Sequence, residues 1–298
     1  MSDALRSGEW IAVDWGTTSM RARRVGVDGS VVAEAAAGPG MGALEAHAFE
    51  PALLEAVAPW LGEVPAEVLV CGMAGARQGW IEAPYVELPA ALTGLLDHAV
   101  RPETRDPRLD VRIVPGLCRR DPADVMRGEE TQLLGLLAGE DMADATVCLP
   151  GTHSKWARIE GRRVTGFETH MTGELYALLS SRSVLRHSVD EGADEGAFDA
   201  AVGEALDDPV ILPRLFGLRA SSLLEDVGPG TAAARLSGWL IGAEIARAPS
   251  GPDAVHVVAS GALASRYARA LAVAEREARV HDGGTLAVAG LAALRARR

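Results

Sequence analysis

Two short stretches of the sequence combine glycine with hydroxyl side chains in the way that phosphate-binding turns do. The first is Gly16-Thr17-Thr18-Ser19, and the second is Gly151-Thr152-His153-Ser154. Glycine lets the backbone come close to a ligand, while threonine and serine add hydroxyl donors to the backbone N–H groups. Neither stretch has the spacing of a Walker loop or of a dinucleotide-binding fingerprint. An ordinary tight turn would explain either one alone, but their equivalent places in two halves of the chain favour a pair of phosphate-binding turns.

Asp14 lies near the end of the apolar run that precedes the first turn. Carboxylate oxygens are ligands that Mg²⁺ prefers, directly or through water, in sites that also contain substrate phosphates. We therefore expect Asp14 to bind Mg²⁺ beside a bound phosphate chain.

A cluster of acidic residues lies at the start of a predicted helix between the two turns. Asp124, Glu129 and Glu130 belong to it, and Gly128 directly precedes the two glutamates. The glutamates would complement the positive N-terminus of the helix whatever their function. A fixed carboxylate can also accept the proton of a hydroxyl group that is being phosphorylated. We expect Glu129 to be this catalytic base, with Glu130 and then Asp124 as alternatives.

Three cationic or imidazole side chains near these residues are suited to bind anions. Lys155 is the single lysine among the 29 basic residues, and it directly follows the second turn. Its compact ammonium group can contact the transferred phosphoryl group or a substrate carboxylate, so it is both a catalytic and a substrate-binding candidate. His153 can donate to the same phosphate oxygens, although a lone histidine is more often structural. Arg127 can clamp a substrate carboxylate through two hydrogen bonds, with an ordinary surface arginine as the alternative.

The predicted elements follow a similar order in the two halves of the chain. In the first half we expect strands at residues 10–15, 20–27, 30–36, 67–71 and 111–114, helices at 44–61, 90–100 and 129–138, and an irregular loop between 114 and 129. In the second half we expect strands at 146–149, 155–159, 163–169 and 255–259, helices at 173–185, 232–246, 262–274 and 285–296, and a polar insertion at 188–228. The repeat predicts two α/β domains, residues 1–144 and 145–298, with the ligand-binding cleft between them.

Composition and charge argue against several other classes of protein. The 298 residues carry a formal net charge of −12, and no basic stripe typical of nucleic-acid-binding proteins is visible. No apolar run reaches the roughly 18 residues that cross a bilayer, and residues 1–6 lack the apolar core of a signal peptide. The three cysteines do not have zinc or disulfide spacing. We therefore expect a cytoplasmic protein whose partners are small molecules rather than nucleic acid or membranes.

The string from Asp14 to Ser19 at a predicted β-hairpin, followed by a second Gly-Thr turn, resembles the sugar kinase/heat-shock protein/actin superfamily. The resemblance implies two actin-like, ribonuclease-H-like domains of βββαβαβα order that flank an ATP cleft. It also implies that the two turns hold the β- and γ-phosphates of ATP from opposite sides. Glu129 after Gly128 stands where carbohydrate kinases of this superfamily carry their base, and Gly261 stands in the turn that lies under the adenosine.

Longer strings along the whole chain are similar to the 2-dehydro-3-deoxygalactonokinase family. They include Gly72-Met73-Ala74-Gly75, Ala83-Pro84-Tyr85, Asp124 through Gln132, Pro150 through Trp156, Met171 through Leu175 and Ile241-Gly242-Ala243-Glu244. The resemblance implies ATP- and Mg²⁺-dependent phosphorylation of 2-dehydro-3-deoxy-D-galactonate on its terminal 6-hydroxyl, which gives the 6-phosphate and ADP in galactonate catabolism. The first domain would then bind the substrate and carry the base, and the second would bind the nucleotide. Besides Arg127 and Lys155, the candidate contacts of the sugar acid are Arg77, Trp80 and Tyr85.

Two other functions stay open on the sequence alone. One is a kinase of another sugar acid, such as 2-dehydro-3-deoxygluconate. The other is a non-kinase ATPase or polyphosphatase of the same superfamily. The sequence also leaves the oligomeric state open, including a homo-oligomer.

Overall fold

The computed structural model describes residues 4–190, 192, 194–225, 227–249 and 254–297. The chain forms two compact units, each with its own sheet and helices. The first unit contains Met1–Ala143, Glu160–Gly166 and Gly283–Arg298, and the second contains Asp144–Ile159 and Phe167–Asp282. The first unit therefore includes the C-terminal segment of the chain, which the sequence analysis assigned to the second domain.

The main sheet of the first unit has the strand order β3-β2-β1-β5-β7, with β4 paired to β2. Its strands are β1 (Trp10–Trp15), β2 (Ser19–Val25), β3 (Val31–Glu34), β4 (Gly38–Pro39), β5 (Ala66–Gly72) and β7 (Leu109–Ile113). Strand β1 pairs antiparallel with β2 and parallel with β5. The nearly continuous apolar sequences of β1 and β5 are typical of strands that are covered on both faces. Because β1 and β5 are parallel, their carboxyl ends lie at the same edge of the sheet.

A second sheet of the first unit occupies the stretch that was expected to be an irregular loop, so that prediction was wrong. It consists of β6 (Tyr85–Glu87), β8 (Gly116–Arg120) and β9 (Ala123–Met126) in the order β6-β8-β9. Strands β8 and β9 form an antiparallel pair that leads directly into α2 (Glu129–Gly139). The partner strand β6 lies far away in the sequence, so the local pattern around residue 116 gave no sign of the sheet.

Two predicted helices of the first unit are shorter or tighter than expected. The short turn η1 (Met41–Ala43) precedes the helix expected at 44–61, which is divided into η2 (Ala46–Ala48), α1 (Phe49–Val57) and η3 (Ala58–Trp60). Pro59 lies in η3 directly after α1, and proline has no backbone N–H with which to continue the hydrogen bonds of an α-helix. The helix expected at 90–100 is the 3-10 helix η5 (Leu92–His98), and η4 (Met73–Gly75) is a further short turn. Leu92 and Leu95 are buried, as expected from the three residues per turn of a 3-10 helix.

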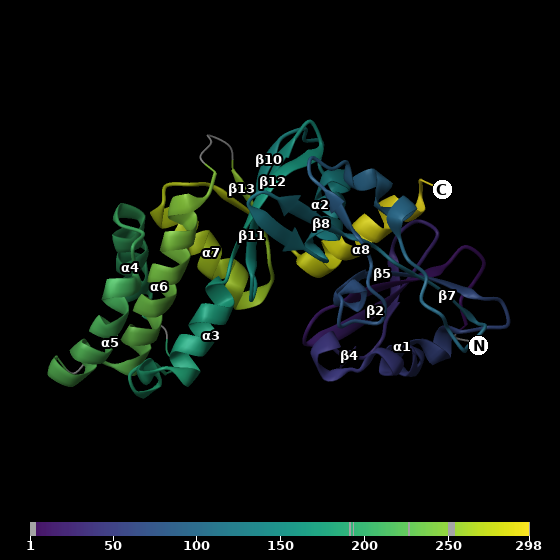
Figure 1. Ribbon diagram of the computed structural model, residues 1–298. Helices are drawn as coiled ribbons and strands as arrows, with labels where there is room; N and C mark the ends of the chain where they lie inside the picture. The colour runs from purple at the N-terminus through teal and green to yellow at the C-terminus, as the bar shows by residue number, and fades with distance from the viewer. Residues whose placement is uncertain (1–3, 191, 193, 226, 250–253, 298) are drawn as a thin grey trace. The chain divides into compact units, whose positions relative to one another are not determined.

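Helices α2 and α8 (Gly283–Arg295) lie side by side in the first unit (Figure 1). Their backbones approach so closely that a Cβ atom added at Gly135 would lie 2.0 Å from the carbonyl oxygen of Leu286. A Cβ atom at Gly290 would lie 2.0 Å from the carbonyl oxygen of Thr131. Glycine at these two positions is therefore required for the packing that joins α8 to the first unit.

The sheet of the second unit repeats the arrangement of the first. Its order is β12-β11-β10-β13-β14, with an antiparallel hairpin beside parallel strands. The strands are β10 (Ala145–Leu149), β11 (Ser154–Glu160), β12 (Arg163–His170), β13 (Val255–Val258) and β14 (Ala278–His281). Strand β14 was not predicted, because it is short, lacks an apolar run, and its two central residues are both exposed.

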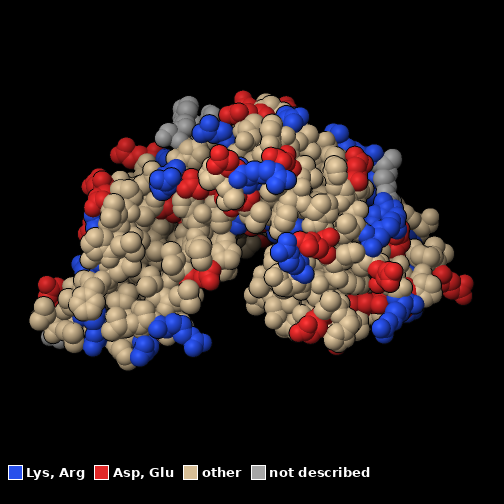
Figure 2. All heavy atoms as spheres, in the orientation of Figure 1, with Lys and Arg blue, Asp and Glu red and all other residues tan. Residues whose placement is uncertain are grey.

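The helices of the second unit include the stretch that was expected to be an insertion. They are α3 (Thr172–Arg182), η6 (Val184–His187), α4 (Glu195–Asp207), α5 (Leu212–Leu224), α6 (Pro229–Arg247) and α7 (Gly261–Val273). Helices α4 and α6 lie side by side (Figure 1), and Gly238 and Gly242 allow the close approach. Within the described ranges, no helix combines the length and the apolar character that crossing a membrane requires. On the visible face in Figure 2, basic and acidic side chains are interspersed.

We predict that Gly290→Ala lowers the free energy of unfolding by about 1–3 kcal/mol, because the added methyl group must displace the backbone of α2. Chemical denaturation would measure this change. Gly203→Ala is the matched control, because a Cβ atom at Gly203 in α4 meets no other atom within 4 Å. The control should be neutral or stabilising by up to about 1 kcal/mol. Equal effects of the two substitutions would contradict the close packing of α2 and α8.

Candidate active site

The first Gly-Thr turn connects β1 to β2 and has its carbonyl groups occupied. The N–H group of Gly16 donates to the carbonyl oxygen of Ser19 at 2.9 Å, which closes the turn. The carbonyl oxygens of Gly16, Thr17 and Thr18 accept hydrogen bonds from the N–H groups of residues 40–42. Within the described part of the chain, the N–H groups of Thr17 and Thr18 have no such partner. The exposed tip of the turn therefore presents donors, as a phosphate-binding turn requires.

Asp14 lies beside this turn, at the carboxyl end of β1. In the sheet it is opposite Arg21 of β2 and Cys71 of β5, and its Oδ1 lies 4.0 Å from the Sγ of Cys71. Burial raises the pKa of Asp14, and the negative charge of Glu129 raises it too, while Arg21 and Arg23 act in the opposite direction.

Two glycines with positive φ account for the approach of Asp14 and Glu129. Gly72 ends β5 with φ +90°, and a Cβ atom there would lie 2.5 Å from the carbonyl oxygen of Trp15. Gly128 precedes α2 with φ +103°, and a Cβ atom there would lie 3.2 Å from the Cα of Gly72. A side chain at either position would separate the end of β1 from the start of α2.

The two glutamates at the start of α2 have different environments. Glu129 is partly exposed, and its Oε2 accepts a hydrogen bond from the backbone N–H of Arg127 at 2.9 Å. Glu130 is fully buried, and its carboxyl group accepts from the N–H of Gly128 at 2.7 Å and from the hydroxyl of Thr131 at 2.9 Å. Burial, followed by the charge of Glu129, raises the pKa of Glu130 to about 8. The carboxyl group of Glu130 is therefore hydrogen-bonded to buried protein groups, whereas the carboxylate of Glu129 is accessible to a ligand.

The third acidic candidate, Asp124, lies on β9 rather than at the start of α2. Its Oδ1 accepts from the N–H of Val125 at 2.8 Å, and its Oδ2 lies 3.9 Å from Arg119. Asp124 is thus engaged with neighbouring residues of the β8–β9 pair.

Arg127 is a buried cation whose hydrogen-bonding capacity is only partly used. It is 9% exposed, its Nη2 donates to the carbonyl oxygen of Ala83 at 2.8 Å, and its guanidinium lies 4.3 Å from the ring centre of Tyr85. Its Nε and Nη1 atoms are buried and have no hydrogen-bond partner among the residues that the structure describes. A buried guanidinium is costly unless its donors are paired, so this arrangement suits an anionic ligand such as a carboxylate. Because the backbone N–H of Arg127 also contacts Glu129, the predicted clamp and the predicted base belong to the same local structure.

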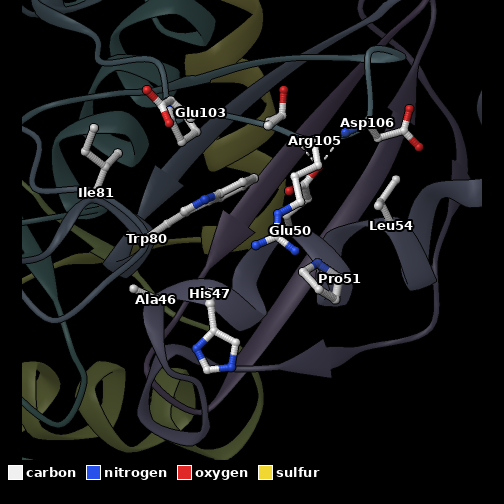
Figure 3. A pocket seen from close by; sticks show the side chains of 12 residues that line it. Ala46, His47, Glu50, Pro51, Leu54, Trp80, Ile81, Glu103, Arg105 and Asp106 are labelled. Carbon is white, nitrogen blue, oxygen red and sulfur yellow. Dashed lines mark hydrogen bonds between the residues drawn. The ribbon is translucent and has the colours of Figure 1, made fainter.

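The two remaining substrate candidates of the first unit lie in different surroundings. Trp80 packs against Trp15 and Phe49, with 6.2 Å between ring centres in each case. It also lines a cavity of about 760 Å³ beside α1, together with Glu50 and Arg105 (Figure 3). The residues that line this cavity do not include Arg127, Glu129 or Asp14. Arg77 is exposed and forms an ion pair with Glu82 at 3.3 Å.

The second Gly-Thr turn connects β10 to β11 in the second unit. The N–H of Gly151 donates to the Oγ of Ser154 at 3.4 Å, and the N–H of Glu174 donates to the carbonyl oxygen of Thr152 at 3.0 Å. Within the residues that the structure describes, the N–H groups of Thr152 and His153 do not donate to a backbone carbonyl oxygen. This turn therefore presents donors in the same way as the first.

The two side chains predicted to assist the second turn are both engaged with protein groups. Lys155 is 5% exposed, and its Nζ donates to the carbonyl oxygen of His153 at 3.0 Å. The Nε2 of His153 lies 2.6 Å from the Oε2 of Glu174, and both side chains are partly exposed. Lys155 therefore supports the backbone of the turn from the interior, and His153 lies at its surface.

A cavity of about 330 Å³ adjoins the second turn within the second unit. It is lined by Gly151, Thr172, Gly173, Tyr176, Ser237, Leu240, Ile241, Ala262, Leu263, Arg266 and Tyr267. Gly261, with φ +59°, directly precedes Ala262 at the start of α7. Tyr176, Ser237 and Arg266 had no predicted role, because helices distant in the sequence bring them together. A ligand with a phosphate chain on the turn and an apolar group in this cavity would fit the arrangement.

Comparison with solved structures defines the class of fold. The activator of the 2-hydroxyisocaproyl-CoA dehydratase from Clostridium difficile, solved with bound ADPNP, matches with a TM-score of 0.52 at 11% identity. The match covers 97% of this chain and 96% of that chain, and at this identity it shows the fold alone. It supports the predicted two-domain α/β fold of the actin-like class, which is confirmed.

Comparison with related sequences identifies the family. The family model of the 2-keto-3-deoxy-galactonokinases matches residues 14–294. A probable 2-dehydro-3-deoxygalactonokinase of Rhizobium meliloti (strain 1021) is 42% identical over 297 residues, which cover 96% of each chain. The 2-dehydro-3-deoxygalactonokinase of Escherichia coli (strain K12) is 33% identical over 96% of this chain and 97% of its own. A crystal structure of a Sinorhizobium meliloti protein with the same enzyme name has a TM-score of 0.88 at 41% identity and covers 97% of this chain and 99% of that one. The chain belongs to the 2-keto-3-deoxy-galactonokinase family, and the resemblance seen in the sequence is confirmed.

We predict that Glu130→Gln makes the stability of the protein less dependent on pH. The pKa of Glu130 is about 8 in the folded state and near 4.5 when the chain is unfolded. The folded state therefore retains a proton that the unfolded state releases, and Glu130 reduces stability progressively as the pH rises from about 4.5 to 8. Glutamine cannot ionise and can still accept the N–H of Gly128. Denaturant midpoints of both proteins between pH 5 and 9 would test this, and an unchanged slope in the variant would contradict the buried neutral carboxyl.

Proposed function

We propose that this protein transfers the γ-phosphoryl group of ATP to the terminal 6-hydroxyl of 2-dehydro-3-deoxy-D-galactonate, with 2-dehydro-3-deoxy-6-phospho-D-galactonate and ADP as products. Two relatives that match nearly the whole chain carry the name of this kinase. The single structural observation that carries the proposal is Arg127, a buried cation with two donor atoms that lack a partner among the described residues and with a backbone N–H that binds the carboxylate of Glu129. Such a pair suits a substrate that has both a carboxylate and a hydroxyl group.

Arg127 binds the carboxylate of the sugar acid in this proposal. Its Nε and Nη1 atoms would gain the partners that the protein does not supply. Tyr85 holds the guanidinium plane in place, because its ring lies directly against it. Arg77, Trp80 and Lys155 are further candidate contacts of the substrate, but each already has a protein partner.

Glu129 accepts the proton of the attacking hydroxyl. Its partial exposure allows contact with substrate, and the N–H of Arg127 fixes the orientation of its carboxylate. Glu130, once proposed as an alternative base, instead stabilises the first turn of α2 through Gly128 and Thr131. A positioned carboxylate base typically contributes a factor of about 10² to 10⁴ to the rate.

The two Gly-Thr turns bind the phosphate groups of ATP through their backbone N–H groups. Gly16, Thr17, Thr18 and Ser19 form one turn, and Gly151, Thr152 and His153 form the other. Gly261 and the cavity beside the second turn bind the adenosine. This assignment is supported by the unpaired N–H groups at each tip and by the size of the cavity.

Mg²⁺ suits the carboxylates beside the first turn. No group of three or more His, Cys, Asp or Glu side chains within the described residues could hold a metal ion. Mg²⁺ commonly binds through one or two carboxylates together with substrate phosphates. Asp14, whose pKa burial raises in the vicinity of Glu129, is the donor that we propose for it. When bound, Mg²⁺ would neutralise charge on the phosphate oxygens.

We predict that ADP release by the wild-type protein requires a sugar acid and is fastest with 2-dehydro-3-deoxy-D-galactonate. Glu129→Gln should lower kcat by about 10² to 10⁴ without changing the affinity for ATP, because only proton removal is lost. A coupled ADP assay with a panel of sugar acids, together with ATP titrations, would measure both effects.

Glu140→Gln, at the exposed opposite end of α2, is the matched control and should retain full activity. Faster turnover of 2-dehydro-3-deoxygluconate would favour the other sugar-acid kinase. ADP release that does not depend on any sugar acid would favour an ATPase. Full activity of Glu129→Gln would contradict its assignment as the base.

We also predict that Arg127→Lys raises the KM for the sugar acid by about 10- to 100-fold, because lysine cannot supply two parallel donors to a carboxylate. The KM for ATP should change little. Arg77→Gln is the comparison, since Arg77 is exposed and paired with Glu82, and it should change the KM for the sugar acid less than about threefold. A larger effect of Arg77→Gln than of Arg127→Lys would show that Arg77 binds the carboxylate instead.

A further inference from the structure

The second unit contains a buried carboxylate that the proposed reaction does not use. Glu244 on α6 is 2% exposed. Its Oε1 accepts from the indole Nε1 of Trp156 at 2.8 Å, and its Oε2 accepts from the hydroxyl of Tyr267 at 2.8 Å and from the hydroxyl of Thr172. Burial raises the pKa of Glu244 above its ordinary value, and these three hydrogen bonds together with the charge of His170 offset only part of that rise. All three neighbours can donate, so together they suit an acceptor carboxylate.

One branch of these contacts leads from Glu244 to the second phosphate-binding turn. Tyr267 has a single hydroxyl proton, which it donates to Glu244. The oxygen of Tyr267 lies 2.9 Å from the Oγ of Ser154, and it can only accept there while its proton is directed at Glu244. The Oγ of Ser154 in turn accepts the N–H of Gly151 at 3.4 Å. The carboxylate therefore sets the direction of each hydrogen bond as far as the turn.

A second branch reaches the same turn through α3. Thr172, the first residue of α3, donates to Glu244. Two residues further on, the N–H of Glu174 donates to the carbonyl oxygen of Thr152 at 3.0 Å. Between them, Gly173 packs so closely that a Cβ atom there would lie 2.4 Å from the carbonyl oxygen of Gly151. The turn is thus held by Ser154 on one branch and by the start of α3 on the other.

We propose that Glu244 is a positioning residue that holds the turn at residues 151–153 in the conformation that binds the phosphate groups of ATP, through Tyr267 and Ser154 and through Thr172. The inference rests on the proposed function, in which this turn binds phosphate. Glu244 is not among the residues that line the cavity beside the turn. Its loss should therefore weaken phosphate recognition more than the binding of adenosine.

Glu244→Gln is the most direct test, because it preserves the size of the side chain. The amide oxygen of the variant can still accept from Trp156. The amide NH₂ group then takes the place of the wild-type oxygen that accepts from Thr172 and Tyr267. Both hydroxyl groups would then have to reverse their direction. Tyr267→Phe removes the hydroxyl that joins Glu244 to Ser154, so it breaks this branch and leaves the branch through Thr172.

The binding of ATP and of adenosine would be measured by calorimetry for each variant. We expect Glu244→Gln to weaken ATP binding by about 10- to 100-fold and Tyr267→Phe by about 3- to 10-fold, in line with charged and neutral hydrogen bonds. Adenosine binding should weaken clearly less than ATP binding in both variants, since the ligand has no phosphate, even though Thr172 and Tyr267 line its proposed cavity. The KM for ATP should rise in parallel, while the KM for the sugar acid stays within twofold.

Glu204→Gln is the matched control, because Glu204 on α4 accepts from the indole of Trp239 at 2.8 Å but has no link to the turn. It should leave the binding of ATP unchanged. Equal weakening of ATP and adenosine binding, or normal ATP binding by folded Glu244→Gln and Tyr267→Phe, would overturn the inference. If Glu244→Gln fails to fold, ATP binding by Tyr267→Phe and Ser154→Ala tests the inference instead. A wild-type protein that binds ATP but does not phosphorylate sugar acids would overturn the proposed function alone.

Discussion

The proposed chemistry of the first unit depends on the close approach of three backbone segments. The parallel pairing of β1 and β5 brings their carboxyl ends to one edge of the sheet, and α2 begins beside them. A side chain at Gly72 would collide with the backbone of Trp15, and Gly128 has a positive φ that other residues rarely adopt. This contact brings Asp14 within the electrostatic influence of Glu129. Backbone packing therefore determines how closely Asp14 and Glu129 approach each other, and their side chains supply the negative charge.

The two Gly-Thr turns show how a similar binding surface can arise twice from one topology. In each unit an antiparallel hairpin lies beside a parallel strand, and the turn of the hairpin presents unpaired N–H groups within the described residues. The supports of the two turns differ. Residues 40–42 hold the carbonyl groups of the first turn, whereas side chains such as Ser154 and Lys155 hold the second. The two turns therefore share a topology but are held in place by different hydrogen bonds.

The sequence predicted those features that depend on local patterns. The strands predicted at 10–15 and 146–149 are largely apolar and match β1 and β10, and the helix after Gly128 has its glutamates at the expected end. Features that depend on distant partners could not be predicted. The sheet that contains β8 and β9 needs β6, and the packing of α8 needs the surface of α2. The sequence also could not distinguish the partly exposed Glu129 from the buried Glu130, because neighbours in three dimensions determine that difference.

The connection of the chain between the two units affects the order in which the protein can fold during synthesis. Helix α2 is made early, but α8, which covers it, is made only after residues 167–282 have been synthesised. The nascent first unit therefore has an apolar surface on α2 that stays open to water while most of the second unit is translated. Such surfaces are where chaperones bind and where aggregation begins. The glycine contacts between α2 and α8 would then close the first unit in a late docking step.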